Sequence, residues 1–327
     1  MNAALLPIIA AVLFYLGYRF YGRYIAKVFK EDDSCLTPAC SMKDDVDYVP
    51  TKPLVLFGHH FASIAGGGPI IGPTVAMMFG FIPVWLWAVL GSIFIGAVHD
   101  MTALFASVRE KGKSVAEIAK STLGNTGFFL FISVTILVLL LVTSAFLGLT
   151  ATALTSLLSL DVLRLDPSQT VVKTIESGGA VKAQIGGIAS TSVIIITGFA
   201  PILGYLVYKR NINVYLASGI AIVVCFVSVA VVMEFPVTLN PNTWMIILCF
   251  YTLLAAGIPV WIILQPRDFT NSFLLYTGVV LLFIAAIVAG LKGVTFQAPA
   301  FNVAGGTAKL GPVLNKVPKS AMSFSIK

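Results

Sequence analysis

The chain has 327 residues, of which 58% are hydrophobic and only 11% are charged, and its mean hydropathy is +0.95. A soluble domain carries about 25% charged residues. So few charges exclude a soluble enzyme, a secreted disulfide scaffold and a disordered chain. The net charge of +7 therefore bears on membrane topology, and no nucleic-acid partner is expected.

Apolar stretches long enough to cross a bilayer recur along the chain. A helix needs about 20 residues to span roughly 30 Å of hydrocarbon. We therefore predict an all-α polytopic membrane protein with about eight transmembrane helices. The first stretch lacks the positive region and cleavage site of a signal peptide, so we expect it to be a retained helix. The predicted spans are residues 3–20, 53–78, 82–107, 127–151, 187–208, 213–234, 243–265 and 272–291.

The loops between these spans differ in charge. Most of the 21 basic residues fall in alternate loops, which we assign to the cytoplasm. On that side, Ser114–Leu123 is predicted to form a short amphipathic helix at the membrane surface. On the opposite side, residues 160–186 contain the turn residues Ser177, Gly178 and Gly179 and are predicted to form a small external loop.

Two of the predicted spans contain helix-breaking residues near their middle. Glycine weakens a helix and proline removes a backbone donor, so breaks are expected at 66–69 and 257–259. The two spans are an odd number of helices apart and cross in opposite directions, which suits a partial inverted repeat with a substrate site at the breaks. The alternatives are a simple kink and close helix packing. The candidate substrate-binding residues are Gly66, Gly67, Gly68, Pro69, Gly257 and Pro259.

All three histidines lie inside predicted spans, and His99 is followed by Asp100. Ionisable groups in a span are costly and mark proton or substrate pathways. At about 1.5 Å per residue, His59 and Asp100 both lie roughly 10 Å inside the inner membrane edge. We therefore assign His59, His60, His99 and Asp100 as candidate proton-coupling residues, with Asp100 as the expected partner of His59 or His60. The alternatives are a metal site at His59, His99 and Asp100, or a helix cap formed by His99 and Asp100 at the interface.

A polar segment, Gln265-Pro-Arg-Asp268, follows the seventh predicted span. Arg267 can anchor the chain at the cytoplasmic surface, and Asp268 or Thr270 can cap the last helix. The functional alternative is an inner gate in which an Arg267–carboxylate pair opens and closes, with Arg267 and Asp268 as the candidate gate residues. No metal or other cofactor is assigned.

Several of these motifs resemble the carbon starvation protein A family. The string Phe57-Gly-His-His-Phe-Ala-Ser-Ile-Ala-Gly-Gly-Gly-Pro69 is the most specific of them. The resemblance assigns residues 1–310 to a transmembrane domain and 311–327 to a short polar and basic tail. Family members continue with further helices, so we expect this chain to correspond to the N-terminal part. The other resembling segments are 18–27, 47–50, 96–100 and 265–268.

The family resemblance implies a multi-pass carrier of the bacterial or archaeal inner membrane linked to carbon starvation. The family is associated with peptide uptake and its relatives with proton-coupled pyruvate uptake. It is also similar to the amino acid–polyamine–organocation transporters, which have inverted five-helix repeats. We therefore expect a secondary transporter of a peptide or pyruvate-like carboxylate, with protons and lipid as its other partners. The alternatives are an intramembrane metal-dependent enzyme and a starvation sensor or receptor.

Overall fold

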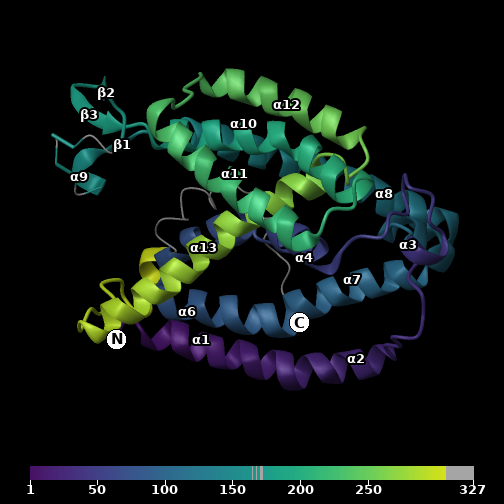
Figure 1. Ribbon diagram of the computed structural model, residues 1–327. Coiled ribbons are helices and arrows are strands. Elements are labelled where there is room, and N and C mark those ends of the chain that lie inside the picture. The colour runs from purple at the N-terminus through teal and green to yellow at the C-terminus, as the bar shows by residue number, and fades with distance from the viewer. Residues whose placement is uncertain (164, 167, 170–171, 307–327) are drawn as a thin grey trace. The chain divides into compact units, whose positions relative to one another are not determined.

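Apolar helices make up most of the chain in the computed structural model, which describes residues 1–163, 165–166, 168–169 and 172–306 (Figure 1). In these residues seven helical runs are long and apolar enough to cross a membrane. An eighth apolar helix, α12 (Pro241–Ala256), has 16 residues and is shorter. The predicted helical membrane architecture is confirmed, with seven candidate spans rather than eight by length.

Contacts divide the chain into two compact units. Among the described residues, unit 1 comprises Met1–Leu36, Ala65–Lys111 and residues 279–306, and unit 2 comprises Thr37–Ile64 and the described part of Gly112–Gly278. The predicted boundary at residue 310 and the predicted tail at 311–327 lie outside the described residues.

Two continuous helical runs pack side by side in unit 1 (Figure 1). The rings of Tyr21 and Phe94 meet edge to face at 5.1 Å, and Trp85 Nε1 donates to the Leu6 carbonyl at 3.1 Å. A third run, α5 (Gly67–Ala76) and the 3-10 turn η2 (Met77–Phe79), precedes the second of them. Each of the two packed runs contains a π-helical segment, which is rare and found often at functional sites. The runs are α1 (Leu5–Leu16), η1 (Gly17–Gly22) and α2 (Arg23–Phe29), and α6 (Phe81–Leu86), η3 (Trp87–Gly96) and α7 (Ala97–Arg109).

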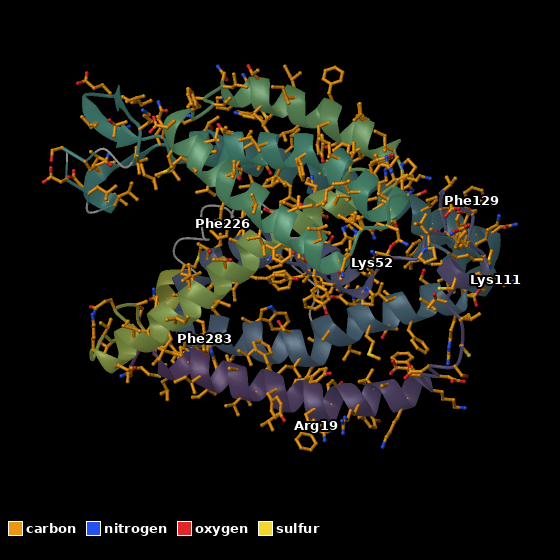
Figure 2. The ribbon with its side chains drawn as sticks, viewed as in Figure 1. Arg19, Lys52, Lys111, Phe129, Phe226 and Phe283 are labelled. Carbon is orange, nitrogen blue, oxygen red and sulfur yellow. The ribbon has the colours of Figure 1, made fainter. Side chains whose placement is uncertain are left out.

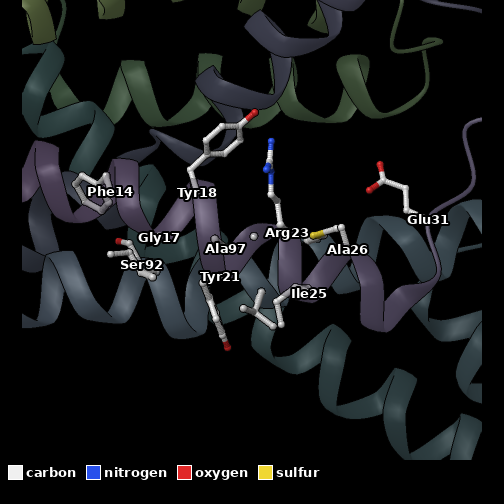
Figure 3. A pocket seen from close by; sticks show the side chains of 14 residues that line it. Phe14, Gly17, Tyr18, Tyr21, Arg23, Ile25, Ala26, Glu31, Ser92 and Ala97 are labelled. Atoms are coloured by element: carbon white, nitrogen blue, oxygen red, sulfur yellow. The ribbon is translucent and has the colours of Figure 1, made fainter.

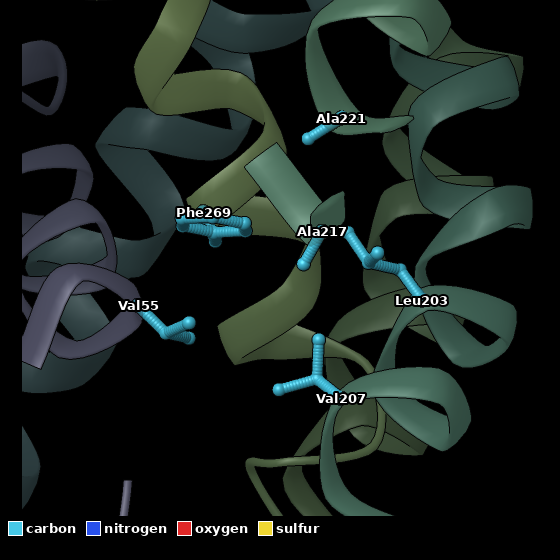
Figure 4. Close-up of a cluster of buried hydrophobic side chains, with 6 residues drawn as sticks. All are labelled: Val55, Leu203, Val207, Ala217, Ala221 and Phe269. Atoms are coloured by element: carbon cyan, nitrogen blue, oxygen red, sulfur yellow. The ribbon is translucent and has the colours of Figure 1, made fainter. Parts of the chain in front are cut away.

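Unit 2 is a helical bundle with a small buried core. Figure 4 shows this core, where side chains from four helices meet. They come from α4 (Pro53–Ile64), from α10 (Ile185–Gly204) with its π-helical end η4 (Tyr205–Lys209), from α11 (Val214–Glu234) and from α13 (Leu264–Leu291). The short helices α3 (Pro38–Ser41) and α9 (Leu160–Leu163) lie in loops. The core residues are Val55, Leu203, Val207, Ala217, Ala221 and Phe269.

The longest helix, α8 (Val115–Leu154), contains the predicted surface segment. Gly124 interrupts it with φ of 73° and ψ of −175°, so residues 115–123 form a separate helical segment, as predicted. A capping box starts this segment, because Ser114 Oγ accepts from the Glu117 N–H and the Glu117 carboxylate accepts from the Ser114 N–H.

A small antiparallel sheet, which was not predicted, lies in the loop after α8. Its strands are β1 (Leu158–Ser159), β2 (Thr174–Ser177) and β3 (Ala180–Ala183), in the order β1-β3-β2. The turn between β2 and β3 has positive φ at Gly178 (65°) and Gly179 (75°), which glycine adopts at no steric cost. The turn residues predicted here are therefore confirmed.

The two predicted breaks have different structures. In the second predicted span, α4 ends at Ile64 and α5 begins at Gly67, so the break falls at residues 65–66 and Gly67–Pro69 form the first turn of α5. At the second position α12 ends at Ala256, as expected. However, α13 already begins at Leu264, and the two helices run in opposite senses across Figure 1. The second break is therefore a turn between two helices, and the spans predicted at 243–265 and 272–291 need this correction.

Large apolar side chains remain exposed along the helices. Phe129 of α8 and Phe226 of α11 are 65% and 55% exposed and project from the ribbon in Figure 2. Water would penalise so much exposed apolar surface, whereas lipid does not. The exposure pattern agrees with a membrane environment.

Gly204 allows the end of α10 to approach the turn before α13. A Cβ atom at this position would lie 2.9 Å from the Ile262 carbonyl oxygen and 3.0 Å from Pro266 Cγ. Because a backbone atom cannot move aside, we expect Gly204→Ala to destabilise the protein by about 1–3 kcal/mol. Thermal unfolding in detergent measures this. Gly219→Ala is the matched control, since no atom lies within 4 Å of that Cβ position. Equal unfolding temperatures for the two variants would contradict the close packing.

Asp44 organises the loop that leads into α4. Its Oδ1 accepts backbone N–H bonds from Val46, Asp47 and Tyr48 at 2.8–2.9 Å, and these bonds, that from Val46 first, lower the pKa of the carboxyl group. Because the pKa of Asp44 is lower in the folded state than in the unfolded state, the ionised carboxyl stabilises the fold. This stabilisation is present above the unfolded-state pKa and is lost as the pH falls through the folded-state pKa. We expect an NMR titration of the Asp44 carboxyl to report a pKa below its ordinary 3.8. Asp44→Asn is expected to speed proteolysis of this loop at neutral pH, and an unchanged rate would contradict the role of Asp44.

Candidate functional site

A chain of polar contacts links three helices of unit 2. His59 on α4 places Nδ1 3.0 Å from Asp268 Oδ2 on α13. Arg267 donates to Asp268 Oδ1 from Nε at 3.0 Å and from Nη2 at 2.7 Å. The same guanidinium donates to Tyr251 Oη on α12 at 2.7 Å. We call His59, Asp268, Arg267 and Tyr251 the polar network.

The network is largely shielded from solvent. The side chains of Asp268, His59 and Arg267 are 12%, 25% and 30% exposed. An ionised group in such surroundings is costly unless it is paired and hydrogen-bonded. Asp268 accepts bonds on both carboxylate oxygens, and the Arg267 guanidinium donates to two partners, so both charges are compensated.

Tight packing at the start of α13 holds the network in place. Pro266, Phe269 and Thr270 each have less than 2% relative exposure. A Cβ atom at Gly58 of α4 would lie 2.9 Å from Ser272 Oγ and 3.0 Å from Phe269 Cδ2, so only glycine lets α4 approach this closely. This contact lies one residue before His59 and therefore sets the position of the imidazole.

A further polar contact fixes the beginning of α13. Tyr208 Oη donates to Gln265 Oε1 at 2.5 Å, which joins η4 to the Gln265–Asp268 segment. This segment was predicted as a polar connection with Asp268 or Thr270 as a helix cap. In the structure α13 starts at Leu264, so both residues lie inside the helix and neither caps it. The cap interpretation is wrong because the helix begins two turns earlier than the spans predicted.

A cavity in unit 1 opens at the first predicted break. It has a volume of about 680 Å³ and lies between α5 and η3. Gly66, the residue before α5, has extended backbone (φ −77°, ψ −168°), and no side chain caps the helix. The first N–H groups of α5 therefore lack a side-chain acceptor, which favours a bound anion. The lining of the cavity includes Gly68, Pro69, Trp87, Gly91 and Ser92.

The second histidine–carboxylate pair is more exposed. In unit 1, His99 Nδ1 lies 3.1 Å from Asp100 Oδ1, and their side chains are 78% and 40% exposed. His60 is partly buried, and the hydrogen bond to Asp268 belongs to its neighbour His59. Helical neighbours point about 100° apart, which explains why only one of the two faces α13.

The structure brings some of the predicted site residues together. His59 contacts the predicted gate residue Asp268, a pairing that the sequence did not indicate, because Asp100 was expected as its partner. Gly68 and Pro69 share one cavity, whereas Gly257 and Pro259 lie in the turn after α12. Tyr251 was missed, since one hydroxyl in an apolar helix carries no signal of its own. In the described residues no group of three or more His, Cys, Asp and Glu side chains is placed to hold a metal ion.

These features define a class: a polytopic helical membrane protein whose apolar helices carry an ion-paired network. The family model described as carbon starvation protein CstA matches residues 2–316, and the chain belongs to this family. No solved structure matches the chain.

The most similar relatives include named transporters. The chain is 34% identical over 323 residues to the peptide transporter CstA of Bacillus subtilis, and the aligned region covers 96% of the chain and 49% of the relative. It is 34% identical over 289 residues to the pyruvate/proton symporter BtsT of Escherichia coli, and this alignment covers 83% of the chain and 36% of the relative. The chain thus spans less than half the length of these relatives.

The two histidine–carboxylate pairs allow a matched test of the network. We expect Asp268→Asn to destabilise the protein by about 2–3 kcal/mol, because it leaves the shielded Arg267 charge without its counter-ion. Asp100→Asn changes a pair that is more open to solvent and is expected to cost less than about 1 kcal/mol. Thermal unfolding of both variants in detergent gives the comparison. Equal losses of stability in the two variants would show that the shielded network stabilises the fold no more than the exposed pair does.

Proposed function

We propose that this chain forms part of a secondary active transporter for a small carboxylate nutrient, a peptide or a pyruvate-like acid, driven by protons. We further propose that it works in the inner membrane of a bacterium or archaeon and serves the response to carbon starvation. The observation that carries this proposal is the polar network within apolar helices. The relatives named above support the substrate class.

The charge balance of the network supports coupling between a proton and an anion. With His59 neutral, Asp268 compensates the charge of Arg267. A proton on His59 leaves one carboxylate between two cations, so the network gains a positive charge. Uncompensated charge is costly in a low-dielectric interior, so a carrier that moves a proton together with a carboxylate keeps its transported load neutral. Proton and carboxylate would then move together as an electroneutral pair.

The cavity between α5 and η3 supports binding of the substrate carboxylate. Its volume of about 680 Å³ falls in the range of small-ligand sites. The uncapped first turn of α5 supplies N–H donors and the positive end of a helix dipole. Gly68 and Pro69 line the cavity beside them. This arrangement recognises the carboxylate and leaves the remainder of the substrate against apolar walls.

In the proposed cycle the Arg267–Asp268 contact acts as the gate. Protonation of His59 weakens the hold of Asp268 on Arg267, because one carboxylate then serves two cations. The loaded state closes while proton and substrate neutralise one another. Loss of the proton restores the pair of Asp268 and Arg267 and releases the substrate carboxylate.

Uptake measurements test the proton step. In cells expressing a version extended to the length of the relatives, labelled pyruvate and dipeptide uptake should rise with an imposed inward proton gradient. His59→Ala and Asp268→Asn are expected to reduce gradient-driven uptake at least tenfold while substrate binding persists. His60→Ala is the matched control, since its imidazole does not face Asp268, and it should retain coupling.

Two outcomes would overturn the proposal. Unchanged gradient-driven uptake in both His59→Ala and Asp268→Asn would remove the network from the coupling step. Ligand binding without flux in proteoliposomes of the extended protein would instead identify a starvation receptor.

A further inference from the structure

A second hollow in unit 1 lies between the two helical runs that contain the π-helical segments. It has a volume of about 610 Å³, and its walls come from α1, η1, α2, η3 and α7. Neither the polar network nor the α5 cavity accounts for it. We call it the π groove. The residues used below are Phe14, Tyr18, Arg23, Glu31, Ser92 and Met101.

The π groove is long and chemically graded. Its lining begins at Phe14 and follows one helical run, which covers about 22 Å to its end at Phe29 at 1.5 Å per residue, and Glu31 lies just beyond that end. Phe14 and Met101 give it apolar walls, whereas Arg23 and Glu31 are the charged residues of the lining. In Figure 3 Phe14 lies at one end of the row of side chains and Glu31 at the other. A groove with an apolar part and a charged end suits an amphiphile rather than a compact polar solute.

The groove also matches one leaflet of a bilayer. A leaflet with its headgroups is about 20–22 Å thick, half of the 40–45 Å of a whole membrane. The run that contains it, Leu5–Phe29, is a candidate membrane span, and Arg23 lies close to its end. An acyl chain would therefore lie along Phe14 while a headgroup reaches Arg23 and Glu31.

The two charged side chains are available to a ligand. Arg23 and Glu31 are exposed, and the ion pairs of the described residues involve neither of them. The position of Glu31 is fixed by the backbone, because its N–H donates to the Ala26 carbonyl at 3.2 Å where Lys30 (φ 54°) ends α2. In Figure 3 Arg23 and Tyr18 project to the same side of the helix. A cation and an anion are thus held on one groove.

We propose that the π groove binds a phospholipid with a zwitterionic, amine-bearing headgroup of the phosphatidylethanolamine type. The Arg23 guanidinium would hold the phosphate in the bidentate manner that suits this pair. The headgroup ammonium would donate to the Glu31 carboxylate. A trimethylated choline headgroup has no N–H to donate, and a glycerol headgroup has no positive charge for Glu31. The charges therefore select the amine-bearing headgroup.

Native mass spectrometry of the full chain in detergent tests this. The protein is mixed with equal amounts of dioleoyl phosphatidylethanolamine, phosphatidylglycerol and phosphatidylcholine. We expect one retained phosphatidylethanolamine per chain, preferred about tenfold over the other two lipids, as one charge-assisted hydrogen bond allows. Glu31→Gln should abolish this preference, and Arg23→Gln should lower retention of all three lipids about tenfold.

Matched controls exclude a general charge effect. Arg19→Gln removes a cation one helical turn earlier, and Asp33→Asn removes an exposed carboxylate two residues later, and neither residue lines the groove. Both variants should keep the wild-type lipid pattern. Circular dichroism checks that every variant is folded.

Three results would overturn the proposal. The first is equal retention of the three lipids by the wild type. The second is a wild-type pattern in both Arg23→Gln and Glu31→Gln. The third is displacement of the lipid by a short peptide such as trialanine in an Arg23-dependent manner, which would make the groove a peptide site. The proton-coupling variants His59→Ala and Asp268→Asn leave lipid retention unchanged if the two sites are independent.

Discussion

The permanent charge of Arg267 within an apolar helix is the constraint on which unit 2 depends. A guanidinium stays ionised in proteins, so the fold must supply its counter-ion and hydrogen-bond acceptors. Asp268 provides the charge, Tyr251 a second acceptor, and His59 occupies the other carboxylate oxygen. Meeting this demand requires α4, α12 and α13 to converge, and the close approach at Gly58 is what makes the convergence sterically possible.

Unit 1 contains two hollows of different chemistry. The α5 cavity is lined by glycine, proline, aromatic and aliphatic groups and by Ser92, whereas the π groove also carries the charged residues Arg23 and Glu31. Backbone N–H groups at the start of α5 supply polarity without placing a charge in the membrane. The shielded ion-paired network thus lies in unit 2, and the α5 cavity without charged lining residues lies in unit 1.

The sequence predicted the elements that depend on composition and local chemistry. Hydrophobic length located the spans, Gly66 and Pro69 located the first break, and Gly178 and Gly179 located the turn between β2 and β3. The sequence did not predict the start of α13, because the polar Gln265–Asp268 segment is typical of a loop. Only the contacts of Tyr208 and of the partners of Asp268, which the sequence does not show, place this segment inside a helix. The partner of His59 was also out of reach, since Asp268 lies 209 residues away and only tertiary packing joins them. Hydrophobic periodicity in the sequence predicted neither the π-helical segments nor the role of Tyr251.

The helix η3 lies between the α5 cavity and the π groove. Ser92 borders both the α5 cavity and the π groove, so the two volumes are separated by the thickness of a single helix. Its hydroxyl is turned back onto the Ala88 carbonyl at 2.6 Å, which keeps this partition free of an outward-facing donor. A larger side chain at position 92 would therefore enter the lining of both hollows at once.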